Sequence, residues 1–148
     1  MSNKQIGALY QAHKHQISKQ RSIPETGMVD SDDLDKVSNR AALMALLDIT
    51  LEEHRVKYSS TLNPLRGRKA LTHLILTKYK WPIDTISKMS LSDSILAIQD
   101  ELFSPNSSEL SKEHLKNINA QYFCQVFEDM PESDWDPVIH ESYLSLRD

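Results

Sequence analysis

The apolar residues of this chain recur every three or four positions along most of its 148 residues, which is the spacing of one face of an α-helix. Residues 90–102 carry the clearest pattern, with Leu91, Ile95, Ile98 and Leu102 on one face. No stretch alternates apolar and polar residues over the length of a strand, and three glycines are too few for a turn-dense β sandwich. The sequence therefore predicts an all-α protein, a single-domain bundle of six or seven helices that spans residues 1–148.

Caps and prolines predict where these helices begin and end. The apolar stripe of segment 1–21 is thin, so this segment is expected to be a peripheral helix or a helix that packs against a partner. A second helix should begin near Ser31, and the capping-box spacing of Thr50 and Glu53 predicts a break near Asp48. Further helices are expected over about 68–80, 83–89 and 90–102, from the 104–108 loop through Phe127, and from Pro137 to about Leu146.

Composition and cysteine usage indicate an ordinary folded protein of the cytosol. The apolar fraction is 39% and the charged fraction is 26%, which is typical of globular chains. The N-terminus has no apolar signal-peptide core, and no stretch approaches 18 apolar residues, so neither secretion nor membrane insertion is expected. Cys124 is the single cysteine, and its apolar neighbours predict a buried, unreactive thiol. A cytoplasmic location is therefore expected.

The charges are distributed unevenly along the chain. The chain has a net charge of −4, yet the segment 54–83 contains seven basic residues and no acidic residue, which leaves −11 for the rest. We call this the basic segment. Its charged residues are Arg55, Lys57, Arg66, Arg68, Lys69, Lys78 and Lys80.

The basic segment suggests a surface for a charged partner. Arg66, Arg68 and Lys69 precede or open the helix over 68–80, where positive charge opposes the helix dipole. Acidic residues of the same chain or an anionic partner should compensate this, and we favour a partner. The leading hypothesis is a non-enzymatic cytosolic interaction or regulatory protein, which acts through charged helical surfaces on a protein partner or on a second copy of itself.

The main alternative is a nucleic-acid-binding regulator that uses the basic segment and a unit resembling a helix-turn-helix at 81–102. The unit has a short helix, a tight turn at 89–91 and a second helix with fitting apolar spacing. The turn is about one residue too short, however, and the second helix carries Asp93, Asp100 and Glu101 without any Lys or Arg. Acidic groups would repel phosphates, so nucleic-acid binding is disfavoured.

No known catalytic or metal-binding pattern is present, so we expect no enzyme, cofactor or metal; a small enzyme with an unfamiliar site is the third hypothesis. There is no nucleophile elbow, Walker loop or dinucleotide fingerprint. His13 and His15 would point about 200° apart on a helix and cannot share a metal ion. The acidic loop 128–136 lacks the glycine of a calcium loop. It is expected to be a solvated surface, with Trp135 anchoring the last helix.

Overall fold

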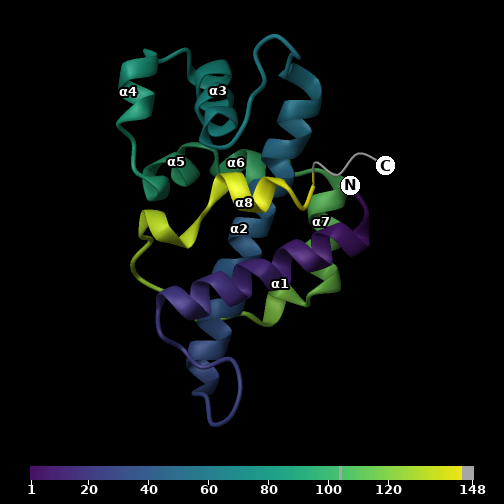
Figure 1. Ribbon diagram of the computed structural model, residues 1–148, viewed down its shortest axis with the longest axis vertical. Coiled ribbons are helices and arrows are strands. Elements are labelled where there is room, and N and C mark those ends of the chain that lie inside the picture. Colours follow the sequence, from purple (N-terminus) through teal and green to yellow (C-terminus); the bar gives the residue numbers. More distant parts are fainter. Residues whose placement is uncertain (104, 145–148) are drawn as a thin grey trace.

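A computed structural model describes residues 1–103 and 105–144, and these residues form a helical bundle without strands (Figure 1). The all-α prediction is confirmed, with eight α-helices in this part of the chain rather than six or seven. No described helix combines the length and the apolarity that crossing a bilayer requires. The helices are α1 (Asn3–Gln20), α2 (Ser31–Tyr58), α3 (Arg68–Tyr79), α4 (Ile83–Ser87), α5 (Leu91–Ala97), α6 (Gln99–Leu102), α7 (Glu109–Asn117) and α8 (Pro137–Glu141), with 3₁₀ helices η1 (Ala120–Tyr122) and η2 (Glu132–Asp134).

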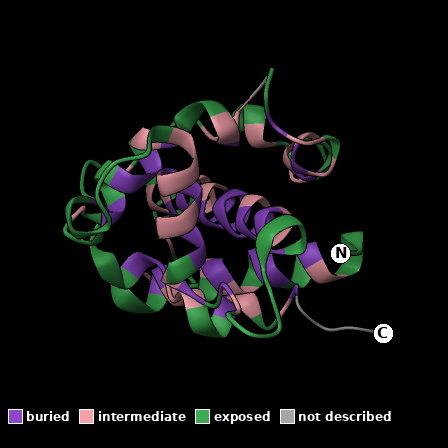
Figure 2. Cartoon of the chain, turned by 90° about the horizontal axis from the view of Figure 1, so that it is seen from above, coloured by how far each residue is buried: buried purple, intermediate pink, exposed green. Residues whose placement is uncertain are grey.

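Helix α2 is the central element, and the buried sides of its neighbours face it (Figure 2). It begins at Ser31, where the Asp30 side chain accepts a hydrogen bond from the backbone N–H of Asp32. The break expected near Asp48 is wrong, because α2 continues without interruption to Tyr58. Two side chains in this stretch of α2 instead make contacts with distant residues. Asp48 is bonded to His13 and Trp135, and Glu53 accepts a hydrogen bond from Ser108.

Helix α1 crosses α2 and buries its apolar stripe against it (Figure 1). A capping box between Ser2 and Gln5 begins the helix, and Ile6, Leu9 and Ile17 are almost completely buried. The thin stripe of segment 1–21 is therefore sufficient to place this helix in the main core. His13 lies in the same stripe and is fully buried, so the stripe also brings a polar group into the core.

Helices α3 to α6 pack together at one end of α2 (Figure 1). Helix α3 matches the expected 68–80 helix and ends where Lys80 takes a left-handed conformation, just before Pro82. The predicted face of Leu91, Ile95, Ile98 and Leu102 is confirmed, because all four residues are buried. The helix that carries this face is divided, since Ile98 leaves the α-helical conformation between α5 and α6.

The expected helix through Phe127 is wrong, because α7 ends at Asn117. Asn119 adopts a positive φ of 55°, and beyond η1 the chain continues without regular helix as far as η2. Side chains of α2 bind the carbonyls of this irregular segment: Asn39 donates to Phe123, and Arg40 donates to Phe127. Cys124 is exposed there, which corrects the prediction of a buried thiol.

The acidic loop is not simply a solvated surface. Asp134 is completely buried, and its Oδ2 accepts hydrogen bonds from Arg40 at 2.6 Å and from Arg21 at 2.8 Å. Arg21 also pairs with Asp129 at 2.9 Å. Two arginines, one from α2 and one from the end of α1, therefore hold this loop against the bundle, because a buried carboxylate requires close charged partners.

The end of the chain follows the predicted cap. Asp136 accepts hydrogen bonds from the backbone of Val138 and Ile139, with Pro137 in the first turn of α8. Trp135 is buried, as expected of a residue that anchors this helix. Helix α8 ends at Glu141, and the last residues of the expected helix, from 145 onward, lie outside the described residues.

Candidate functional site

The fold pairs part of the basic segment with carboxylates of the same chain. Arg55 is buried, and its Nε lies 2.9 Å from Glu52 and 3.8 Å from Glu141. The Arg68 guanidinium lies 2.6 Å from Glu132 in the acidic loop. Two of the seven cations are therefore neutralised by residues that lie outside the basic segment.

Lys78 is paired as well. Its ammonium group forms a close ion pair with Asp100 and lies 3.3 Å from Glu101, both at the start of α6. The hydrogen bond from Lys78 is the main cause that lowers the pKa of the exposed Asp100 carboxyl. Two of the acidic residues that argued against a recognition helix thus bind a cation of the basic segment.

The helix dipole of α3 is also compensated within the chain. The backbone N–H of Gly67 donates to Glu141 at 2.7 Å, so a carboxylate lies at the positive end of the helix. Gly67 has a φ of 60°, and an added Cβ would lie 3.5 Å from Val138, so the backbone conformation and the approach of α8 favour glycine here. The compensation that we expected from a partner is therefore supplied by the same chain.

Four cations of the segment have no carboxylate partner in the described part of the chain: Lys57, Arg66, Lys69 and Lys80. All four are exposed. Lys69 donates to the side-chain oxygen of Asn63 at 2.5 Å, near the start of α3, whereas Lys80 follows the last residue of that helix. Eleven residues of helix separate these two positions by about 17 Å, so the free charges do not gather at one point.

One end of α3 presents exposed aromatic and apolar side chains next to Lys80. The rings of Tyr79 and Trp81 are stacked, with centroids 4.3 Å apart and planes at 10°. Both residues are more than a third exposed, while Ile83 is 60% and Leu96 is 70% exposed. The Tyr79 hydroxyl donates to the carbonyl of Ala97, next to Leu96, at 2.5 Å. We call Tyr79, Lys80, Trp81, Ile83 and Leu96 the aromatic end of α3.

A polar pocket of about 360 Å³ lies between α2, α3 and the start of α7, and Lys57 and Lys78 both line it. His54 lines this pocket as well, and its Nε2 lies 2.8 Å from Nδ1 of His73. Burial, with the nearby charges of His73, Lys57 and Arg55, lowers the pKa of His54 to about 4. The imidazole of His54 is therefore neutral at neutral pH.

Three of the ionisable groups that line this pocket, Glu53, His54 and Glu101, are bonded to neighbouring side chains, whereas Lys57 has no carboxylate partner among the described residues. Glu53 accepts a hydrogen bond from Ser108 at 2.7 Å, and Glu101 lies 3.3 Å from Lys78. His54 is held by His73. These contacts describe a closed internal network rather than a group that is aimed at a substrate.

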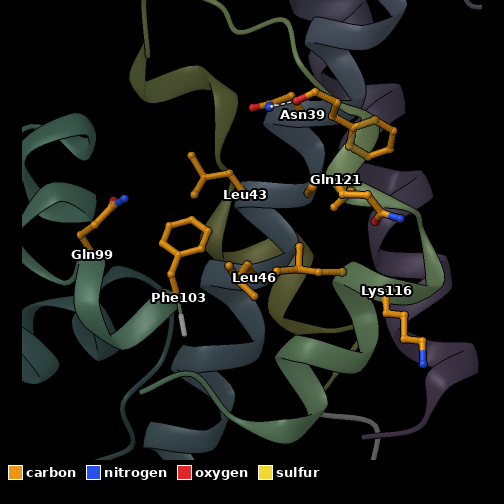
Figure 3. A pocket seen from close by; sticks show the side chains of 11 residues that line it. Asn39, Leu43, Leu46, Gln99, Phe103, Lys116 and Gln121 are labelled. Carbon is orange, nitrogen blue, oxygen red and sulfur yellow. Dashed lines mark hydrogen bonds between the residues drawn. The ribbon is translucent and has the colours of Figure 1, made fainter. Parts of the chain in front are cut away.

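A second cavity of about 560 Å³ lies between α2, α6 and α7 and is mainly apolar (Figure 3). Leu43, Leu46 and Phe103 point into it, with Phe123 also in its lining. Lys116 is the single ionisable residue in this lining among the described residues. The cavity has the size and the apolar lining that suit a small apolar ligand, but it brings together no acid, base or nucleophile from the described residues.

The unit at 81–102 differs from a DNA-binding helix-turn-helix in its second helix. Helix α5 has seven residues, and its buried Leu91 and Ile95 face the core. Its first turn carries Asp93, and Asp100 follows in α6. The exposed side of this second helix therefore offers carboxylates and Leu96 rather than cations, and the exposed Lys88 of the unit lies before it, paired with Asp84.

Sequence reasoning identified the cations of the basic segment but overlooked its aromatic residues. The available signal was the alternation of Lys78, Tyr79, Lys80 and Trp81, which places two large rings among charges immediately before Pro82. A helix cannot continue past such a proline, so rings at this point are less readily covered by a following turn.

The chain matches no protein-family model, and neither a curated protein nor a solved structure is significantly similar to it.

Proposed function

We propose that this chain is a non-enzymatic interaction or regulatory protein of the cytosol, and that it binds a protein partner through the aromatic end of α3. The observation that carries this proposal is the stacked, exposed pair of Tyr79 and Trp81 beside the unpaired Lys80. Tyrosine and tryptophan are among the residues that most often dominate the free energy of protein–protein binding. Two more exposed apolar residues lie close in the chain to these contacts: Ile83 follows Trp81 by two positions, and Leu96 precedes Ala97, whose carbonyl binds the Tyr79 hydroxyl.

The charge of this surface suggests the chemistry of the partner. Lys80 has no carboxylate partner among the described residues, whereas the neighbouring Lys78 is neutralised by Asp100 and Glu101. A partner segment with one apolar or aromatic side chain flanked by carboxylates would cover the rings and pair with Lys80. The charge pair would mainly raise specificity and the association rate, while the rings would supply most of the affinity.

The two cavities support a binding role over catalysis. An enzyme places titratable groups so that they converge on the reacting atoms of a substrate. In the polar pocket Glu53, His54 and Glu101 are bonded to neighbouring side chains, and in the described lining of the apolar cavity Lys116 is the single ionisable group. Binding therefore requires fewer assumptions than catalysis.

Single-stranded nucleic acid is the second candidate partner. Bases stack on exposed aromatic rings, and Lys78 and Lys80 flank the ring of Tyr79 in the chain. Three paired cations of the basic segment reduce the positive charge available for phosphates, which disfavours this alternative relative to a protein.

The test compares variants of the aromatic end with a matched control. Trp81→Ala and Lys80→Glu should each abolish capture of a partner from the source lysate, whereas Lys88→Glu should retain it. Lys88 is exposed and follows α4, and it is paired with Asp84 outside the aromatic end. The captured protein is then purified and its affinity is measured by calorimetry with wild type and all three variants. Equal affinity of wild type and Trp81→Ala would contradict the proposal.

Two further measurements distinguish the alternatives. Sedimentation of the purified protein shows whether the partner is a second copy, in which case Trp81→Ala should lower the oligomeric mass. Titration with a single-stranded oligonucleotide over a salt series tests the nucleic-acid alternative. Tight binding that weakens steeply with salt and is lost in Trp81→Ala would replace the protein proposal.

A further inference from the structure

A cluster of buried polar side chains lies where α1, α2 and α8 meet. His13 comes from α1, Asp48 from α2 and His140 from α8, and all three are almost completely buried. His13 Nε2 lies 2.6 Å from Asp48 Oδ2, and the two imidazole rings have centroids 3.8 Å apart. One side-chain donor atom from each residue falls within 4.8 Å of the others.

The hydrogen bonds of this cluster are incomplete. Asp48 uses both of its oxygens, since Oδ1 accepts a hydrogen bond from Trp135 Nε1 at 2.8 Å. Nδ1 of His13 and Nδ1 of His140, by contrast, have no hydrogen-bond partner among the described residues, although both atoms are buried. A buried polar atom without a partner is costly, so natural cores rarely retain two such atoms on adjacent rings.

We infer that His13, Asp48 and His140 form a binding site for a divalent transition-metal ion of the Zn²⁺ class. Two imidazoles and one carboxylate are a common ligand set for such ions. The donors come from three helices far apart in the sequence, so the ion would tie α8 to α1 and α2. Trp135 Nε1 donates a hydrogen bond to one carboxylate oxygen of Asp48, which leaves the other oxygen directed at His13. At metal sites such an outer hydrogen bond orients the ligating side chain.

The observed distances require only a small adjustment for binding. Ligand atoms on one tetrahedral Zn²⁺ are about 3.3 Å apart, because each lies about 2.0–2.1 Å from the ion. Asp48 Oδ2 and His13 Nε2 are closer than this at 2.6 Å, so the ion would replace the hydrogen bond between these two atoms, and the donors as a set lie within 4.8 Å. Binding would require these side chains to rotate within the core, and His140 is carried by α8, which is only five residues long.

His15 provides a matched control on the same helix. It lies on the exposed side of α1 and pairs with Glu25 at 2.8 Å, outside the cluster. His15→Gln therefore removes an imidazole two positions from His13 without changing the proposed ligands. The comparison with His140→Gln separates the buried site from adventitious binding at a surface histidine.

The experiment uses untagged protein and Zn²⁺ in competition with a chromophoric chelator. Wild type and His15→Gln should bind a single tight Zn²⁺ per chain and should melt at a higher temperature with Zn²⁺ than with a chelator. His140→Gln should bind more weakly by more than about tenfold and should lose the thermal shift. Full binding in His140→Gln, or no tight binding in wild type, would overturn the inference.

A second measurement does not depend on the folding of a substituted core. In a Trp81→Phe background Trp135 is the single tryptophan, and its indole is bonded to Asp48. Adding Co²⁺ should quench its fluorescence with the same saturation as the appearance of ligand-field absorption in the visible range. Absence of both signals in the folded protein would exclude the site. This outcome is independent of the aromatic end, because Trp81 is absent from the protein measured.

Discussion

The basic segment and the buried histidine cluster place their polar groups in opposite ways. The basic segment is continuous in sequence, yet the fold distributes its charges, and partners elsewhere in the chain neutralise Arg55, Arg68 and Lys78. In the cluster, His13 and Asp48 are 35 positions apart, yet folding brings them within 2.6 Å. The comparison shows that a local excess of charge does not by itself make a site, whereas convergence of distant, incompletely bonded groups can.

The largest expected effect concerns the buried ion pairs. Arg40→Ala should destabilise the protein by about 3–5 kcal/mol, because it removes one of the two arginines bonded to the fully buried Asp134. Urea denaturation of the variant measures this change. Replacing Asp134 by Leu in the same chain should recover part of the loss, and an unchanged midpoint for Arg40→Ala would show that the carboxylate is not held as described.

Acid should destabilise the protein through the buried imidazole of His54. Burial, with neighbouring charges, lowers the pKa of His54 from 6.5 to about 4, so the unfolded chain binds a proton in this range that the folded chain does not. The free energy of unfolding should therefore fall as the pH decreases from about 6.5 towards 4.

His54→Gln provides the measurement for this pH dependence. The variant should lose less stability than wild type between these pH values, by roughly 1–3 kcal/mol, since one pKa unit corresponds to about 1.4 kcal/mol. Denaturation curves at several pH values give the two slopes. Parallel slopes would mean that His54 titrates normally in the folded protein.

A smaller effect is expected from the basic residues at the start of α3. Replacing Arg66, Arg68 and Lys69 together by Ser should cost about 1 kcal/mol or less, because the Arg68–Glu132 pair is partly exposed and such pairs contribute little. Chemical denaturation checks the value. Complete unfolding would instead show that the fold depends on the ion pairs of these three residues, as it is expected to depend on the pair of Arg40 and Asp134.

The smallest effect on stability concerns Cys124. The segment around it is irregular and the thiol is exposed, so a thiol reagent should modify it in the native protein without unfolding. Mass spectrometry follows the reaction, and circular dichroism checks that the helices remain. Slow modification would place the thiol back among the buried groups of the core.

Local sequence signals predicted the helices well where the deciding interactions join residues only a few positions apart in the chain. The caps at Ser90 and Asp136, the end of α3 before Pro82 and the buried face from Leu91 to Leu102 follow directly from the order of residues. The same reasoning was wrong at Asp48 and beyond Asn117. In both places contacts between distant elements, rather than neighbours in the sequence, decide the course of the chain.

The candidate sites could be predicted only in part. The sequence contained the exposed cations and the alternating rings of the aromatic end, but it did not show which cations are paired. The sequence also contained His13, but His13 and His15 point in different directions on a helix, so this pair did not predict a metal site. His140 lies far along the chain, and no spacing pattern linked it to His13, because the two residues meet only through the packing of their helices.

By itself, the sequence determined the helical class, most helix boundaries and the core face of α5 and α6, because periodicity and capping depend on residues three or four positions apart. The tertiary structure decided which charges are neutralised, that Cys124 is exposed, and that His13, Asp48 and His140 meet. The physical reason is that the two kinds of interaction depend on different distances, one along the chain and the other in space. Ion pairs and shared donor atoms depend on distances of a few ångströms in space, and only the packing of α1, α2 and α8 brings those groups together.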